Sequence, residues 1–241
     1  MYKSIFFCAF GLASAACVAT TTCEAVGKRV ATTDPSEWRG GVPYESCKAM
    51  PDDPNKLIMI MDDKVYVVDA ATAKIVSEGD MGTTPFQANS YAIDTARYRL
   101  APKTRAFAIR FASTQPHYHG GGSSESLNLY VVDGERIRVV MESLLTDNWV
   151  GGMNCTDESN PSPSTCATHY EGTRADIAIA KTAHHGYADL IVTTYSGSCD
   201  DGDEKENCDT LDEKRLTVKD KVTTLRFDGK QYPVPTEMQG Q

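Results

Sequence analysis

The densest group of side chains with metal-binding chemistry is an acidic segment late in the chain. Cys199 and Cys208 bracket it, and its carboxylates are Asp200, Asp201, Asp203, Glu204 and Glu206. Calcium is a hard cation that takes about six to eight oxygen ligands, and clustered carboxylates can supply several of them. Lys205 stands where a further ligand is expected, so a solvated hairpin tip tied by a disulfide is the other interpretation. The sequence predicts either a calcium site or a charged loop at this point.

Histidines form the second candidate group. His117 and His119 are two residues apart, so in a strand both imidazoles would lie on one face, as two ligands of a zinc or copper site. The glycines that follow them favour a loop instead. His184 and His185 are adjacent and would point to opposite faces of a strand, where either could do acid–base work with a nearby carboxylate. A metal site needs three or four converging ligands, which neither pair supplies alone.

No residue is predicted to be catalytic. The chain contains no Gly-x-Ser-x-Gly elbow, no His-Glu-x-x-His and no glycine-rich phosphate loop. A Ser–His–Asp triad assembled from distant segments stays open as an alternative. We expect no cofactor other than the calcium that the acidic segment could bind.

The residues after His185 resemble a known repeat. The run Gly186-Tyr187-Ala188-Asp189-Leu190 leads into an apolar β segment. It is similar to the tail of the FG-GAP repeat, in which such a strand follows a calcium-binding, aspartate-rich loop. Here Lys181-Thr182-Ala183 takes the place of that loop. A turn capped by Asp189 explains the same residues.

A mainly β scaffold is expected to position these groups. Two apolar runs, 57–61 and 64–68, flank Asp62-Asp63, which predicts a tight hairpin. The run from Val65 to Val76 resembles a repeat of quinoprotein-type β-propellers, in which a strand ends in Asp before an Ala-Thr-Gly-Lys turn. Ala73 replaces the usual glycine of that turn.

A doubled pattern dominates the rest of the chain. Repeats 97–140 and 174–234 each predict about four antiparallel strands and end in an Asp-Gly hairpin, at Asp133-Gly134 and Asp228-Gly229. A full propeller needs at least about four blades, so we predict a sandwich or a partial propeller within one β domain, 57–241. Residues 142–148 are expected to form one helical turn.

The start of the chain reads as an export signal. Lys3 precedes a short apolar run, and small residues favour cleavage after Ala19, so 1–19 is predicted to be a signal peptide. Lipidation of Cys17 is the alternative. Cleavage leaves an even number of cysteines, which suits an oxidising compartment. Nearness along the chain predicts the disulfides Cys23–Cys47, Cys155–Cys166 and Cys199–Cys208, the first of them tying down an irregular leader, 20–56.

Composition restricts the function classes. The net charge is −9 and the basic residues are scattered, which argues against nucleic acid or an anionic membrane as partner. No segment after the signal is apolar enough to span a bilayer. We expect a periplasmic or secreted, non-catalytic protein that binds a protein partner through loops 115–124 and 200–209. In type it resembles inhibitors of lysozyme and immunity proteins against secreted toxins. An exported hydrolase and a structural envelope protein are the alternatives.

Overall fold

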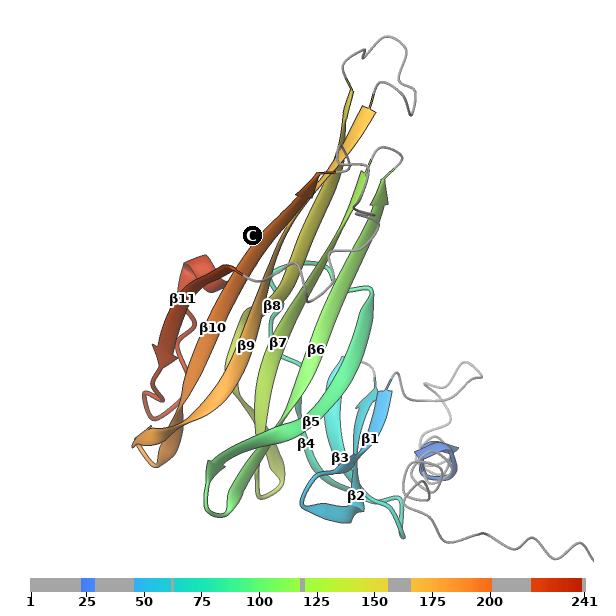
Figure 1. Ribbon diagram of the computed structural model, residues 1–241. Helices are drawn as coiled ribbons and strands as arrows, with labels where there is room; N and C mark the ends of the chain where they lie inside the picture. The colour runs from blue at the N-terminus through green and yellow to red at the C-terminus, as the bar shows by residue number, and fades with distance from the viewer. Residues whose placement is uncertain are drawn as a thin grey trace, which may run out of the picture.

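The computed structural model is mainly β, as predicted, and the eleven strands of its described residues form one mixed sheet that does not close (Figure 1). The structure describes residues 23–28, 46–61, 63–117, 120–155, 166–200 and 218–239. The signal peptide predicted at 1–19 lies outside these residues and stays a prediction.

The first four strands form a small antiparallel meander at one end of the sheet. They are β1 (Ser46–Met50), β2 (Asp53–Met61), β3 (Lys64–Asp69) and β4 (Ile75–Asp80). The predicted hairpins on either side of β3 are confirmed. Asp63 and Ala73 adopt positive φ angles of 60° and 58° in the two turns, a conformation that glycine adopts most easily.

The remaining strands are longer and antiparallel to their sequence neighbours. They are β5 (Ser90–Ala101), β6 (Thr104–His117), β7 (Gly120–Asp133), β8 (Arg136–Cys155), β9 (Cys166–His184), β10 (Tyr187–Asp200) and β11 (Val218–Leu225). Strand β8 joins the parts of the sheet. One edge pairs with β7; the other pairs with β4 at Arg136 and with β9 from Asp147 to Cys155.

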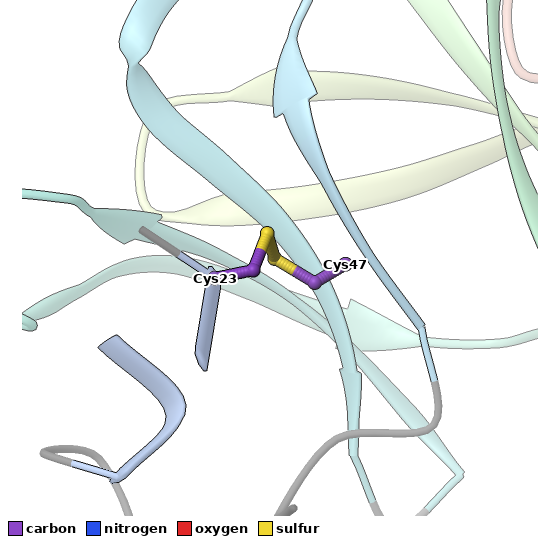
Figure 2. The surroundings of a disulfide bond; sticks show 2 residues. All are labelled: Cys23 and Cys47. Atoms are coloured by element: carbon purple, nitrogen blue, oxygen red, sulfur yellow. A yellow bond between two sulfur atoms is a disulfide. The ribbon is translucent and has the colours of Figure 1, made fainter. Parts of the chain in front are cut away.

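Three buried clusters hold these strands together. The largest takes residues from β5 to β11 and from the C-terminal segment, and the second lies mainly between the β1–β4 meander and strands β5 to β7. The third packs Val26, from the short helix at 23–28, against β2 and β3. The predicted Cys23–Cys47 disulfide is confirmed and ties this helix to β1, with a Cα–Cα distance of 6.0 Å (Figure 2).

The two predicted Asp-Gly turns differ in outcome. Asp133-Gly134 joins β7 to β8, with Gly134 at a φ of 63°. Asp228-Gly229 also forms a turn, in which the Asp228 carboxylate accepts hydrogen bonds from the next two backbone N–H groups after the glycine. No strand returns from it beside β11 in the described residues, because Tyr232 is drawn into the core instead. Its N–H donates to the Val140 carbonyl at 2.6 Å.

Two further expectations change with the structure. The helical turn predicted at 142–148 is wrong, because these residues belong to β8, where Ser143 adopts a φ of 59° at an irregularity of the ladder with β7. The strands form one open mixed sheet, and no propeller blade is seen among the described residues. The duplication of 97–140 and 174–234 stays a prediction.

Candidate functional site

Strands β7 to β10 continue beyond the buried clusters as a part that we call the sheet extension. It comprises residues 120–125, 147–155, 166–174 and 195–200, and β8 and β9 project furthest (Figure 1). None of the buried apolar side chains of the described protein comes from these residues. Backbone ladders join its strands and run without interruption into the packed part of each strand.

One face of this region is hollowed into a groove of about 640 Å³. The described residues that line it are Asn148, Val150, Glu171, Gly172, Thr173, Ser196, Gly197, Ser198 and Val218. Side chains directly opposite each other in a ladder share a face. Asn148, Thr173 and Ser196 form one such row, which continues to Val218 on β11.

The opposite face of the extension is aromatic. Trp149 and Tyr170 lie at a ring-centroid distance of 6.0 Å. A Cβ at Gly151 would lie 2.3 Å from the Tyr170 ring, so only glycine allows this ring to pack on the β8 backbone. Arg174 lies over the Tyr195 ring at 5.2 Å and forms an ion pair with Asp176 at 3.4 Å.

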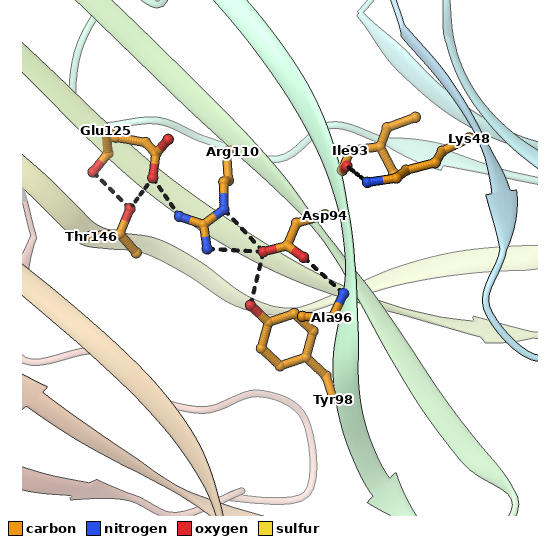
Figure 3. A network of polar contacts seen from close by, with 8 residues as sticks. All are labelled: Lys48, Ile93, Asp94, Ala96, Tyr98, Arg110, Glu125 and Thr146. Atoms are coloured by element: carbon orange, nitrogen blue, oxygen red, sulfur yellow. Dashed lines mark hydrogen bonds and ion pairs between the residues drawn. The ribbon is translucent and has the colours of Figure 1, made fainter. Parts of the chain in front are cut away.

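A charged network marks the base of the extension (Figure 3). The Arg110 guanidinium bridges Asp94, at 2.9 Å, and Glu125. Tyr98 donates to Asp94 at 3.1 Å, and Thr146 donates to Glu125 at 2.8 Å. Burial opposes ionisation of Asp94, but hydrogen bonds from the Ala96 N–H and from Arg110 outweigh it and lower the pKa of this carboxyl.

Asp147, beside this network, is a carboxyl whose pKa is raised. It lies opposite Glu125 on β7 and opposite Arg174 on β9. Burial first, and then the negative charge of Glu125, raise its pKa to about 6, against the opposing effect of Arg174 and Arg110. This carboxyl therefore gains its negative charge as the pH rises through about 6. It lies at the first residue pair of the β8–β9 ladder.

The second chemical feature is at the tip of the β9–β10 hairpin. Asp189 is 1% exposed and accepts hydrogen bonds from Thr182 Oγ1 at 2.6 Å and from His184 Nδ1 at 2.7 Å. Burial opposes its ionisation, but these two bonds and the charges of His184 and Arg226 lower its pKa. An ionised Asp189 requires the proton on Nδ1, which leaves Nε2 of a neutral imidazole as the basic nitrogen.

The two adjacent histidines of the predicted site have different surroundings. His184 and Asp189 meet, whereas His185 is exposed in the turn with a φ of 48°. The FG-GAP-like run forms this turn and the start of β10, and Thr182 binds the aspartate.

The other predicted groups are described only in part. His117 ends β6 and Asp200 ends β10, but their side chains lie outside the described residues. His119, the rest of the acidic segment (Asp201, Asp203, Glu204 and Glu206) and Cys208 lie outside them altogether. In the described part of the chain no three His, Cys, Asp or Glu side chains converge as metal ligands.

Backbone pairing bears on two expectations, one about a disulfide and one about a binding loop. Cys155 and Cys166 are direct register partners at the end of β8 and β9, and their disulfide stays a prediction. Residues 115–117 and 120–124, expected in a binding loop, extend the β6–β7 ladder instead. The groove lies on strands, and its hydroxyl and amide side chains form no sequence motif.

Comparison with protein-family models, with curated proteins and with solved structures found no match to this chain. Among the described residues there is also no helix of the length and apolarity needed to cross a membrane.

Proposed function

We propose that this chain is an exported, non-catalytic binding protein that acts in the periplasm or outside the cell and recognises a protein partner through its sheet extension. One observation carries the proposal. The extension is a multistranded surface with a groove on one face, and none of its described side chains is a buried apolar one.

A sheet normally buries at least one face against a core. Val150 of the extension and Val218 of the adjoining β11 are instead exposed at 58% and 60% beside the groove. Rigid strands that carry exposed apolar and hydrogen-bonding side chains suit recognition of another molecule. Within this class, an inhibitor of a secreted enzyme or an immunity protein fits the acidic composition and the predicted export.

The test is isolation of a complex. Mature protein, residues 20–241, is immobilised and exposed to envelope and secreted fractions of the source organism, and bound proteins are identified by mass spectrometry. We expect one partner that co-elutes at a fixed stoichiometry in size-exclusion chromatography. Recovery of no stoichiometric partner from either fraction would contradict the proposal.

An exported hydrolase is the second candidate, and the His184–Asp189 pair favours it. A buried carboxylate that orients an imidazole is the arrangement a general base requires. Within the described residues, however, the one hydrogen bond of the His184 ring is to Asp189. Ester, peptide and glycoside panels test this function, which requires turnover by the native chain that His184→Gln abolishes.

A further inference from the structure

We propose that the groove across β8 to β11 receives a lysine- or arginine-rich polypeptide segment of the partner. This inference rests on the protein-binding function proposed above and assigns the chemistry of the surface that the groove recognises. It is carried by the shape of the groove, by the carboxylates of Glu171 and Asp220 on its face and by its two exposed valines.

The groove is as wide as one polypeptide segment. Strands β9 and β10 supply its floor, and Val150 on β8 and Val218 on β11 stand at its two sides. Three inter-strand steps of about 4.8 Å separate β8 from β11, which gives a width of about 14 Å. A helix with its side chains is about 10–12 Å across, and an extended strand is narrower.

The charged side chains described on the groove face include two carboxylates. Glu171, with a side chain 74% exposed, lines the groove and pairs with His169 at 3.0 Å, and no Lys or Arg is among its described lining residues. Asp220 on β11 adds a second carboxylate, bonded to Ser196 at 2.9 Å. Arg174 follows Thr173 and therefore projects from the other face, where it lies over the Tyr195 ring. The groove is thus an acidic surface on an acidic protein.

The valines select among cationic ligands. A hydrated metal ion would gain nothing from Val150 and Val218. Lysine and arginine side chains combine an apolar stem with a charged head, so the stems can cover the valines while a head reaches Glu171. The hydroxyl and amide groups of Asn148, Thr173 and Ser196 can bond the segment's backbone.

The experiment uses a defined probe. A fluorescein-labelled peptide of twelve residues, alternating Lys and Ala, is titrated with the mature protein at about 0.15 M salt, and anisotropy is recorded. We expect saturable binding that weakens about tenfold or more in Glu171→Lys and about threefold or more in Val218→Ser. The same peptide with Glu in place of Lys should not bind.

Matched controls distinguish binding in the groove from effects of the net charge and of nonspecific apolar contact. Asp133→Lys changes the net charge equally at a residue 71% exposed in the β7–β8 turn, and Ile75→Ser removes an exposed apolar side chain on β4. Both should bind the peptide within about twofold of the native chain. Equal loss in Glu171→Lys and Asp133→Lys, or no saturable binding by the native chain, would overturn the inference.

Binding of the variants to the native partner tests the groove assignment separately from the proposed binding function. If a stoichiometric partner is isolated and Glu171→Lys and Val218→Ser bind it as tightly as the native chain, the binding function stands and the groove assignment is wrong. If no partner exists, the function itself is wrong. Unfolding temperatures of all four variants within a few degrees of the native protein would attribute the losses to the surface.

Discussion

Replacing Asp147 by asparagine should stabilise the protein at neutral pH and leave it unchanged at acidic pH. The carboxyl is largely buried beside Glu125, and its pKa is raised from 3.8 to about 6. The folded state therefore binds this proton more tightly than the unfolded state does. The stability that the group contributes is complete below pH 4 and is lost as the pH rises through 6.

The size of the effect follows from the shift. The difference between 3.8 and about 6 is roughly two units, and at about 1.4 kcal/mol per unit it sets an upper limit of about 3 kcal/mol. Partial solvent access screens the interaction, so we expect about 1–2 kcal/mol of added stability at pH 7.5. Asparagine keeps the size of the side chain and removes only the charge.

Urea unfolding of the native chain and of Asp147→Asn between pH 4 and pH 8 measures this difference. Asp176→Asn is the matched control, because Asp176 also contacts Arg174 but is 56% exposed. Its stability should stay within about 0.5 kcal/mol of the native chain at every pH. A destabilised Asp147→Asn at pH 7.5, or a difference that does not change between pH 4 and pH 8, would refute the reasoning.

Three further predictions concern the structure around the site. Asp189→Asn should lower the free energy of unfolding by about 1–3 kcal/mol, because the buried amide keeps one acceptor oxygen and turns an NH2 donor toward Thr182 or His184; thermal denaturation measures it. Combined Cys23→Ser and Cys47→Ser should cost about 3 kcal/mol in urea unfolding, since the disulfide joins residues 24 apart. Arg110→Met should cost about 2 kcal/mol, because two half-buried carboxylates lose their shared cation, and added salt should reduce the loss.

Local patterns predicted the local structure well. The hairpins around β3 and the Asp133-Gly134 turn follow from turn residues between apolar runs, and the Cys23–Cys47 disulfide follows from nearness in the chain. The partner of each strand across the sheet depends on distant contacts. Pairing of β8 with both β4 and β9 on one edge, and docking of Tyr232 on β8 in place of a returning strand, carry no local signal.

Prediction of candidate sites met the same limit. His184 and Asp189 could be expected to meet, because they are five residues apart across a hairpin. The groove could not, because its residues come from four strands and none belongs to a motif. The network around Arg110 was missed for the same reason, since Asp94 and Glu125 lie on the strands at either side of it.

The packed part of each strand determines which side chains line the groove. Strand β8 places Met141 and Leu144 in the core and, further along, Asn148 and Val150 in the groove. A register slip of one residue would turn every side chain of a strand to the other face. Such a slip would expose buried core side chains, so the core prevents it, and Asn148 and Val150 stay on the groove face although they contribute no buried apolar contact themselves. Side chains at these two positions can therefore vary with little effect on folding, as the proposed binding function requires.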